Sequence, residues 1–564
     1  METTNQQIKP FSKLSKSSLK TGWLCAILTG VMTFMAFPTD LSPDYNFWWL
    51  IWFSHVPILW WLSDKTPQQG FKWGYLTGII INTGGYYWIA ELIQTFGHLP
   101  MAVAVIGLAL HSLLVGLIWG VWGYLICALS PKWGRLLVVP IAMMAAEYTL
   151  PRIFDAHMGD CQYPFVMIMQ ISDLLGVTVV TGLIYLFNVA LCDALDGKYK
   201  GLKIATSLIM VSLIYGGIRM SQVDEQMNQA QKLRIGMVEG DIGIFESEPR
   251  QKKRDHLLIQ QNLSAQLEAQ GAELIIWPES AYRASGIPAD LKAFTPSPVP
   301  LVKHHEEDLQ KRTPRQDQIT PQRGFTTPLL FGGNGIGIAE PSTDSEKARG
   351  RGRRLYYNRA WLLGEQGEAL GYYDKVHRLV FGEYIPFGDI FPVFYEWLPA
   401  ASRTEIGSGV KSLAFTSRKG TQARLGMLIC YEGIIPSFTR ELMKTQPDIL
   451  INLTNDDWFA ATAERYLHFA LALPRSIESR RMYLRATLTG VSAIVDANGR
   501  ILKWTSTEDP EVLLDDIPLL KGQTLYSQIG DILPQCSLLF ILCALWQRRR
   551  DETKVDQTVA AEEK

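Results

Sequence analysis

Long apolar stretches follow one another up to about residue 220 and recur once near the C-terminus. A helix that spans a bilayer needs about 20 mostly apolar residues, with a range of about 17–25. Several stretches meet this length, whereas the first, second and fifth are marginal and are short enough to be re-entrant. We predict eight spans, at Trp23–Phe37, Phe47–Leu62, Trp73–Phe96, Met101–Leu129, Leu136–Leu150, Ile171–Leu191, Ile204–Ile218 and Ile529–Trp546.

Between the seventh and eighth stretches the pattern changes to short apolar runs that alternate with polar, helix-like segments. Asn498-Gly499 is a strong short-range signal for the turn of a β-hairpin at 491–504, and 358–375 has a similar pattern. Buried strands that alternate with helices predict an α/β layered domain. The other expected elements are strands at 233–241, 272–280, 328–335, 424–433 and 448–456, and helices at 248–270 and 434–445.

Residues 296–325 interrupt this pattern because they are rich in proline and charge and poor in apolar side chains. Such a segment buries too little surface to order itself, so we predict a mobile loop or insertion. His304 and His305 precede three acidic residues, which is a possible metal-binding cluster. The cluster lacks tight ligand spacing, so a solvated charge run is the favoured interpretation.

The composition and the loop charges support a membrane protein. Hydrophobic residues make up 47% and charged residues 19%, whereas soluble domains average roughly 25% charged. Lysine and arginine gather in alternate loops, and such residues favour the cytoplasmic side. The predicted organisation is a cytoplasmic tail at 1–22, a membrane domain with seven spans at 23–220, an external domain at 233–519, an eighth span at 529–546 and a cytoplasmic tail at 547–564. The N-terminus is expected to be an uncleaved anchor.

Charge and cysteine usage exclude two classes of function. The net charge of -1 leaves no basic excess to neutralise the phosphates of a nucleic acid. The chain has seven cysteines, but Cys430 alone lies in the predicted external region. That region therefore holds neither a disulfide nor a zinc site built on several cysteines. An unpaired cysteine in an external domain is a candidate reactive thiol, although a buried structural cysteine is the alternative.

Three chemically complementary residues stand where predicted strands end, namely Glu279, Lys375 and Cys430. Ligand sites of open α/β sheets form beyond the carboxyl ends of strands, so these side chains are expected to converge. A carboxylate can take the proton of an attacking thiol, and a lysine can stabilise the resulting oxyanion. The set suits acyl transfer through a thioester. Taken singly, each residue also has a structural explanation: Glu279 as a helix cap, Lys375 as a solvated cation and Cys430 as a core thiol.

The chain resembles the nitrilase superfamily and, over almost its whole length, the bacterial apolipoprotein N-acyltransferase family. The similar stretches of the external region are "IIWPES", "YDKVHRLVFGEYIPFG", "CYEG", "LTNDDWF" and "LPRSIESRRMYLRATLTGVSAIVDANGR". "WGYLTGIIINTGGYYWIAELIQTFGHLP" resembles the third membrane segment of that family. The resemblance implies an αββα sandwich on the periplasmic side of a polytopic helical membrane domain, in the bacterial inner membrane.

The resemblance also implies residue roles. Cys430 matches the nucleophile, Glu279 the general base and Lys375 the oxyanion stabiliser. Glu383 matches a second glutamate of the family, although its motif is one residue longer than the common spacing. The resemblance implies no metal and no cofactor. Further residues match positions beside the cysteine or lining the site, namely Tyr431, Glu432, Asn455, Asp456 and Trp458.

One stretch departs from the family pattern. Early in the external domain the family has an asparagine, a proline and a later tryptophan, where this chain has Asp241, Gly243 and no tryptophan. Phe245 is a candidate replacement for the tryptophan. Among the membrane segments, Glu91 and Glu147 are carboxylates in or near predicted spans, where such groups are costly and often functional. Pairing with polar neighbours near a span end is the equal alternative.

The expected reaction has two half-reactions. An acyl chain moves from a membrane phospholipid to Cys430, and then to the α-amine of a diacylglyceryl-cysteine at a lipoprotein N-terminus. Both substrates follow from the resemblance. Two alternatives stay open, a membrane-tethered amidase that uses water as acceptor and a non-catalytic membrane scaffold.

Overall fold

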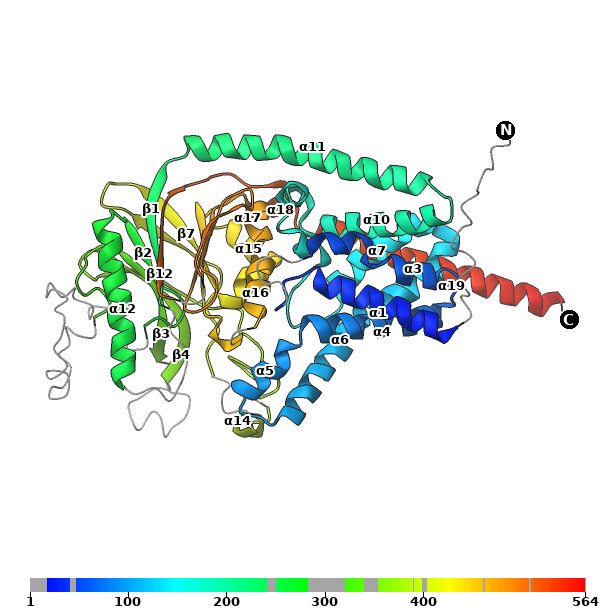
Figure 1. Ribbon diagram of the computed structural model, residues 1–564, viewed down its shortest axis with the longest axis horizontal. Helices are drawn as coiled ribbons and strands as arrows, with labels where there is room; N and C mark the ends of the chain where they lie inside the picture. The colour runs from blue at the N-terminus through cyan, green and yellow to red at the C-terminus, as the bar shows by residue number, and fades with distance from the viewer. Residues whose placement is uncertain are drawn as a thin grey trace, which may run out of the picture. The chain divides into compact units, whose positions relative to one another are not determined.

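The computed structural model describes residues 18–40, 47–240, 250–282, 320–338, 354–388, 390–397, 403–459, 462–506 and 509–562. The chain divides into two compact units that are each built from separate stretches of sequence. The first unit contains Met1–Met220, Thr462–Pro474 and Ile529–Lys564, and the second contains Ser221–Ala461 and Arg475–Gln528. Figure 1 follows the chain from the helices of the first unit to the strands of the second.

The first unit is helical, and every apolar stretch predicted to span contains helix. Its long helices are α1 (Leu19–Met35), α4 (Pro67–Gly85), α6 (Met101–Trp133), α7 (Arg135–Thr149), α10 (Thr178–Leu195), α19 (Ile532–Glu562) and α11 (Lys200–Gln229), whose residues after Met220 belong to the second unit. The shorter ones are η2 (Trp48–Leu50), α2 (Ile51–Ser54), α3 (Val56–Leu62), α5 (Trp88–Thr95), η3 (Met158–Gln162), α8 (Val166–Met169), α9 (Ser172–Leu175) and α16 (Glu464–Ala472).

Within the described residues, α6, α10 and α11 are long and apolar enough to cross a membrane. The third predicted span is not one helix, because it breaks at Tyr86 between α4 and α5. The preceding pair Gly84-Gly85 has low helix propensity. The sixth predicted span breaks at Gly176, which adopts φ +74°. The first unit is thus an apolar helical bundle, while the count of eight spans stays a prediction.

Glycines let α4 and α6 pack closely. Gly70, Gly74 and Gly78 recur every four residues on α4. An added Cβ at Gly74 would lie 2.2 Å from the carbonyl oxygen of Trp119, and one at Gly70 would lie 2.3 Å from that of Gly123. Small residues at this spacing allow helix backbones in membranes to approach each other. The stretch that resembled a membrane segment is therefore a helix-packing surface.

The second unit contains two six-stranded sheets, ordered β12-β1-β2-β3-β4-β5 and β11-β10-β9-β8-β7-β6. In each sheet three central strands are parallel, β1 to β3 and β7 to β9, and the flanking pairs are antiparallel. The strands are β1 (Lys232–Glu239), β2 (Leu274–Ile276), β3 (Leu329–Ile338), β4 (Arg354–Leu363), β5 (Ala369–Asp374), β6 (Ser412–Thr416), β7 (Gln422–Ile429), β8 (Ile449–Thr454), β9 (Tyr483–Thr487), β10 (Ala493–Val495), β11 (Ile501–Trp504) and β12 (Glu511–Pro518).

Helices accompany both sheets, as an α/β layered domain requires (Figure 1). The predicted helices at 248–270 and 434–445 are α12 (Arg250–Ala269) and α15 (Pro436–Met443). Leu267 of α12 packs with Val238, Ile275 and Trp277 in a buried core. The remaining helices of this unit are α14 (Val393–Trp397), η6 (Cys430–Ile434), η7 (Asp457–Phe459), α17 (Pro474–Ser479) and α18 (Leu525–Ile529).

The predicted mobile loop at 296–325 extends too far toward the C-terminus. Gln322 is buried and donates hydrogen bonds to the carbonyl oxygens of Thr327 and Gly364 at 3.1 and 2.9 Å. Phe325 is 3% exposed and belongs to the core around Trp277. Ordered packing therefore begins by residue 320, and residues 296–319 lie outside the described residues. The polar composition of 296–325 did not reveal this packing, because Gln322 is a polar residue that is nevertheless buried with its hydrogen-bond partners.

Candidate active site

Cys430 sits at a strained turn that begins where a buried strand ends. The strand β7 ends at Ile429, and Cys430 opens η6 with φ +52°, a left-handed conformation that is rare outside glycine. Strain of this kind clusters at active sites, where the surrounding structure holds it in place. Its side chain is 5% exposed. Cys430 therefore lies at the carboxyl end of a strand that pairs in parallel with β8, as the sequence predicted.

Lys375 follows directly on β5 and holds two carboxylates near its ammonium group. Its Nζ lies 2.8 Å from Oε2 of Glu383 and 3.6 Å from Oε1 of Glu279. Asn358 of β4 donates hydrogen bonds to Oε1 of Glu279 at 2.6 Å and to Oε1 of Glu383 at 2.9 Å. The backbone N–H of Leu379 completes the set by donating to Glu383 at 2.8 Å. The two glutamates and the lysine therefore form one buried cluster.

Glu279 follows β2 by three residues and is held by its backbone. The N–H of Gly332 donates to the carbonyl of Pro278 at 3.0 Å, and the N–H of Tyr282 donates to the carbonyl of Gly332 at 3.1 Å. A Cβ at Gly332 would lie 2.5 Å from Cα of Glu279, so only glycine fits there. Among the described residues, nothing hydrogen-bonds Oε2 of Glu279. This oxygen is left available as a proton acceptor.

Burial and charge set different proton affinities in the cluster. Burial raises the pKa of Glu279, and the charge of Glu383 adds to the effect. Burial would also raise the pKa of Glu383, but the charge of Lys375 outweighs it and lowers that pKa. Burial opposes the charged form of Lys375, but the surrounding anions hold its pKa well above the usual value. The geometry thus favours an ion pair of Lys375 with Glu383 and a more basic Glu279.

The thiol of Cys430 stays protonated in this resting arrangement. Burial raises its pKa, and the charge of Glu279 raises it further, whereas Lys375 acts in the opposite direction. A thiol of this kind needs a base at the moment of attack, because the thiolate is the nucleophile. Glu279 is the carboxylate whose charge acts most strongly on it.

Glu432 is a structural anchor for the loop that follows Lys375. Its carboxylate accepts hydrogen bonds from the hydroxyl of Tyr373 at 2.8 Å and from the N–H groups of Val376, His377 and Ile429 at 2.7, 3.0 and 2.8 Å. Burial raises its pKa to about 7. One carboxylate thus ties β7 to the segment that carries Lys375. Its neighbour Tyr431 is half-buried in η6.

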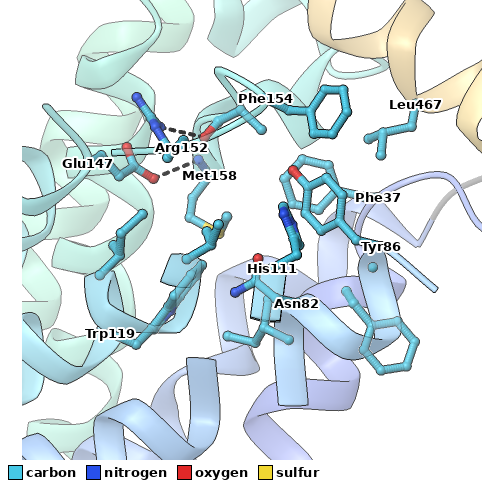
Figure 2. Close-up of a pocket in the computed structure, with 16 residues that line it drawn as sticks. Phe37, Asn82, Tyr86, His111, Trp119, Glu147, Arg152, Phe154, Met158 and Leu467 are labelled. Atoms are coloured by element: carbon cyan, nitrogen blue, oxygen red, sulfur yellow. Dashed lines mark hydrogen bonds between the residues drawn. The ribbon is translucent and has the colours of Figure 1, made fainter. Parts of the chain in front are cut away.

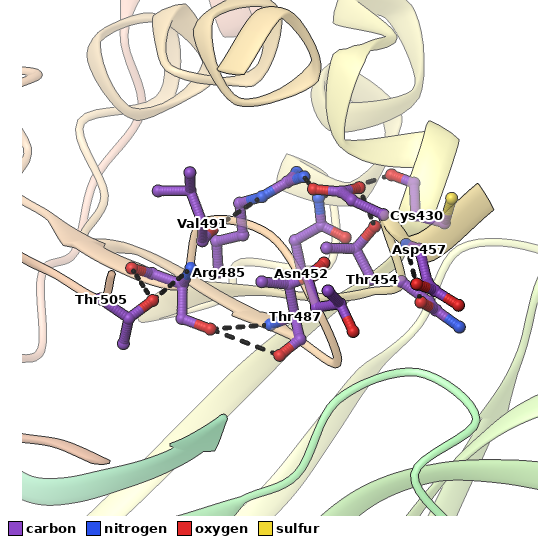
Figure 3. A network of polar contacts seen from close by, with 12 residues as sticks. Cys430, Asn452, Thr454, Asp457, Arg485, Thr487, Val491 and Thr505 are labelled. Atoms are coloured by element: carbon purple, nitrogen blue, oxygen red, sulfur yellow. Dashed lines mark hydrogen bonds and ion pairs between the residues drawn. The ribbon is translucent and has the colours of Figure 1, made fainter. Parts of the chain in front are cut away.

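The loop after β8 contributes to a polar network, and Figure 3 shows Thr454, Asp457 and Arg485 of this network together with Cys430. Asp456 is fully buried and forms an ion pair with Arg485 of β9 at 2.5 Å. Asn455 is buried and accepts a hydrogen bond from the N–H of Asp457 at 3.1 Å. Trp458 lies half-buried in η7. Asp456 is among the charges that act on the Cys430 thiol, so the loop contributes to the electrostatics of the site.

Sequence reasoning missed two contributors to this site. Asn358 belongs to none of the motifs found in the sequence. It contributes to the site because the register of the β-sheet places its amide between the carboxylates of Glu279 and Glu383. Gly332 was inside a predicted strand, and "FGGNG" signalled a close backbone approach without saying to what. The positions Asp241, Gly243 and Phe245, where the chain departs from the family pattern, lie outside the described residues.

Two family models match the chain. The model for the apolipoprotein N-acyltransferase N-terminal domain matches residues 18–190, and the carbon-nitrogen hydrolase model matches residues 334–525. An apolipoprotein N-acyltransferase of Geobacter metallireducens is 27% identical, covering 90% of this chain and 92% of the relative. One of Bdellovibrio bacteriovorus is 28% identical, covering 85% and 84%. Both models and these relatives support a protein of the apolipoprotein N-acyltransferase type in the nitrilase superfamily.

The two matches lie mainly in different units of the fold, although the carbon-nitrogen hydrolase match also contains residues 462–474 of the first unit. The N-terminal domain match covers α1 to most of α10, and the carbon-nitrogen hydrolase match contains Lys375, Glu383 and Cys430. Among solved structures, an amidase from Nesterenkonia sp. is 18% identical, covers 54% of this chain and 95% of the amidase, and has a TM-score of 0.33.

Proposed function

We propose that the chain transfers an acyl chain from a membrane phospholipid to the α-amine of the N-terminal diacylglyceryl-cysteine of lipoproteins. The family supplies the class of reaction. The observation that carries the chemistry is the buried cluster in which Lys375 pairs with Glu383 while Oε2 of Glu279 has no partner among the described residues. A thiol, a free basic oxygen and a fixed cation are the three requirements for acyl transfer through a thioester.

In the first half-reaction the sulfur of Cys430 attacks the ester carbonyl of the phospholipid. Glu279 takes the thiol proton as the C–S bond forms, and Lys375 stabilises the charge that develops on the carbonyl oxygen. The tetrahedral intermediate then collapses, and the ester C–O bond breaks. Glu279 returns the proton to the departing oxygen, so the lysophospholipid leaves as an alcohol and the acyl chain remains on Cys430.

In the second half-reaction the α-amine of the acceptor attacks the thioester carbonyl. An N–C bond forms, the C–S bond breaks, and the proton of the amine passes through Glu279 to the departing sulfur. Cys430 is regenerated as a thiol. Lys375 stabilises the second oxyanion in the same way. Glu383 and Asn358 keep Lys375 and Glu279 in place in both half-reactions.

The proposed setting is the bacterial inner membrane. The charge pattern of the loops supports eight spans, both termini in the cytoplasm and a periplasmic catalytic domain. The exposed surface of the helical unit supports a lipid environment, since large apolar side chains such as Ile106, Leu110 and Val211 are exposed. A membrane-bound catalytic domain suits two substrates that are both lipid-anchored.

Single-turnover measurement of each half-reaction tests the proposal. Cys430→Ala is expected to form no thioester. Glu279→Gln is expected to acylate Cys430 about 10²–10⁴-fold more slowly. Lys375→Ala is expected to slow both half-reactions, each by about 2.7–4 kcal/mol of activation free energy. Acyl transfer by Cys430→Ala would overturn the thioester mechanism, and release of free fatty acid in place of acylated acceptor would make the chain a hydrolase.

A further inference from the structure

Arg359 of β4 and Asp374 of β5 form a buried ion pair that connects the two strands next to the catalytic cluster. Nε of Arg359 lies 2.5 Å from Oδ1 of Asp374, and Nη2 lies 2.9 Å from Oδ2. Arg359 is 4% exposed. A guanidinium that meets both oxygens of a carboxylate fixes direction as well as distance. The two residues are also directly opposite each other in the register of the strands, so the ion pair favours this register over others.

The sequence neighbours of this pair belong to the catalytic cluster. Asn358 precedes Arg359 and Lys375 follows Asp374, and the N–H of Lys375 donates to the carbonyl oxygen of Asn358 at 2.9 Å. Successive side chains of a strand point to opposite faces of the sheet. The ion pair therefore lies on one face, and the side chains of Asn358 and Lys375 lie on the other. A register that is fixed on the first face is fixed on the second as well.

The strand β5 depends on β4 for its register. It is the last strand of its sheet, so within that sheet it pairs with β4 alone. The pairing shifts by one residue between Leu362 and Leu363 of β4, where β5 has the extra residue Leu370. The hairpin turn therefore does not by itself set the pairing beyond this bulge. A slip of one residue would move Lys375 to the other face of the sheet.

The surroundings of Arg359 specify an arginine. Its guanidinium carbon lies 3.9 Å from the ring centre of Tyr372 and 4.6 Å from that of Trp361. Gly335 of β3 leaves room for the side chain, because an added Cβ there would lie 2.4 Å from Nε of Arg359. Stacking on aromatic rings and bidentate pairing are properties in which lysine does not replace arginine. A cation of another shape would therefore fix the register less well.

We propose that Arg359 is a positioning residue that acts through Lys375: by pairing with Asp374 it holds the register of β5 and keeps the Lys375 ammonium beside Glu383. The proposal rests on the proposed function, which assigns stabilisation of the oxyanion to Lys375. Without the guanidinium, β5 is free to slip, and the charge of Lys375 no longer acts on the thiol of Cys430. β4 stays in place because it also pairs with β3.

Alkylation of Cys430 by iodoacetamide tests this role without any lipid. The rate is followed for the full-length protein in detergent micelles, at one mildly alkaline pH, by mass spectrometry of the Cys430 peptide. The charge of Lys375 favours the thiolate, which is the species that reacts. Lys375→Ala should therefore slow alkylation, by about tenfold for a shift of one pKa unit in the thiol.

The decisive comparison is a double-mutant cycle. Arg359→Gln is expected to slow alkylation by a similar factor, about tenfold. Adding Arg359→Gln to Lys375→Ala should slow it no further, because residues that act through one another are not additive. A merely structural role for Arg359 would instead give additive losses. Single-turnover acylation of Cys430 from phospholipid is expected to show the same pattern for the three variants.

Arg418→Gln is the matched control. Arg418 pairs with Glu365, in the turn between β4 and β5, and both side chains are exposed. Exposed ion pairs contribute little, so this variant should alkylate at the unmodified rate. If Arg359→Gln does not fold, Arg359→Lys replaces it. That variant keeps the charge without the bidentate geometry and should give a smaller loss that is again absent in the Lys375→Ala background.

The outcomes separate this proposal from the proposed function. An unchanged alkylation rate for Arg359→Gln, an additive loss in the double variant, or an equal loss for Arg418→Gln would overturn the positioning role. Failure of the unmodified protein to acylate Cys430 from phospholipid, with the alkylation pattern as expected, would instead remove the proposed function alone.

Discussion

At the scale of single residues, two glutamates with the same chemistry lie in different surroundings. Glu383 faces the Lys375 ammonium at 2.8 Å and receives a backbone N–H, which favours its charged form. Glu279 lies farther from the same cation and keeps one oxygen unpaired among the described groups. Pairs of titratable groups whose environments separate their pKa values are typical of acid–base sites.

The bridging amide of Asn358 offers a sharp test of this division. Asn358→Ala removes hydrogen bonds to both carboxylates, and bonds to charged groups contribute about 1.5–3 kcal/mol each. We expect single-turnover acylation of Cys430 to slow at least tenfold without loss of folding. Asn334→Ala is the matched control, because Asn334 pairs with Asn358 in the register of β3 and β4 and is exposed. Equal rates for the two variants would contradict a role for the amide.

A second test at this scale uses pH. Glu239 ends β1 and is 1% exposed, and its carboxylate accepts hydrogen bonds from the N–H of Ser492 at 3.3 Å and from the hydroxyl of Thr505. Burial raises its pKa from 4.5 to about 8. The folded chain therefore holds a proton that the unfolded chain has lost between these values, and stability falls as pH rises through that window.

The Glu239→Gln variant lacks this titration. We expect it to be more stable than the unmodified protein by on the order of a few kcal/mol above pH 8, and the difference should shrink as pH falls toward 4.5. Thermal unfolding across this range measures it. Glu511→Gln, which changes the residue opposite Glu239 in the register of β12, removes a charge that helps to raise the pKa of Glu239, so it should show a smaller trend in the same direction. A constant offset for Glu239→Gln at every pH would refute the titration.

Residue types at predicted strand ends were sufficient to propose Glu279, Lys375 and Cys430, because an acid, an amine and a thiol can be recognised in the sequence, and their catalytic roles stay predictions. The contribution of Asn358 could not be recognised from the sequence. It is separated from Glu279 by 79 positions and from Glu383 by 25, and only the strand register brings the three together. A residue that acts by connecting others cannot be identified until the fold that connects them is known.

At the scale of elements, the tight contact between β3 and the segment after β2 determines where Glu279 lies. Gly332→Ala would place a methyl group 2.5 Å from both Cα of Glu279 and the carbonyl oxygen of Pro278, and backbone cannot move aside cheaply. We expect the variant to lose at least about 1–3 kcal/mol of stability through overpacking and to acylate Cys430 far more slowly. Thermal unfolding and single-turnover acylation measure the two effects.

Gly371 of β5 provides the matched control for this substitution. A methyl group there meets only the side chain of Leu413 at 3.3 Å, which is able to shift. Gly371→Ala should therefore retain most of its stability and activity. Comparable losses for both variants would show that glycine matters for the strands in general and that the approach to Glu279 has no special role.

Elements with simple apolar patterns were predictable, and those that depend on tertiary partners were not. The strands β1, β2, β3, β7 and β8, both hairpins and both helices matched the sequence pattern. β9 was missed because "YLRAT" carries a charge at its centre, and the fold accommodates Arg485 there through its ion pair with Asp456 and a hydrogen bond to the carbonyl oxygen of Val491. β12 was missed because its acidic residues obscure the alternation that pairs it with β1.

At the scale of the whole molecule, the division into units does not follow the order of the sequence. The predicted external domain at 233–519 was one continuous block, but Thr462–Pro474 groups with the first unit. Leu467 of α16, within that segment, lines a cavity of the helical unit, which Figure 2 shows. The apolar helix pattern of this segment is equally suited to either unit, so the sequence alone could not assign it to one of them.

Membrane topology is the prediction that belongs to the molecule as a whole. Lysines and arginines in alternate loops predict cytoplasmic termini and an exported 233–519 region. A reporter that is active only after export is expected to be active at the turn between β6 and β7. The turn should tolerate the insertion, because Gly420 there has φ +83° and nothing lies within 4 Å of an added Cβ. The same reporter fused after Arg550 of α19 is expected to be inactive, and a cytoplasmic reporter should give the opposite pair. The reverse pattern would refute the eight-span arrangement and place Cys430 in the cytoplasm, away from the surface at which exported lipoproteins would present their amines.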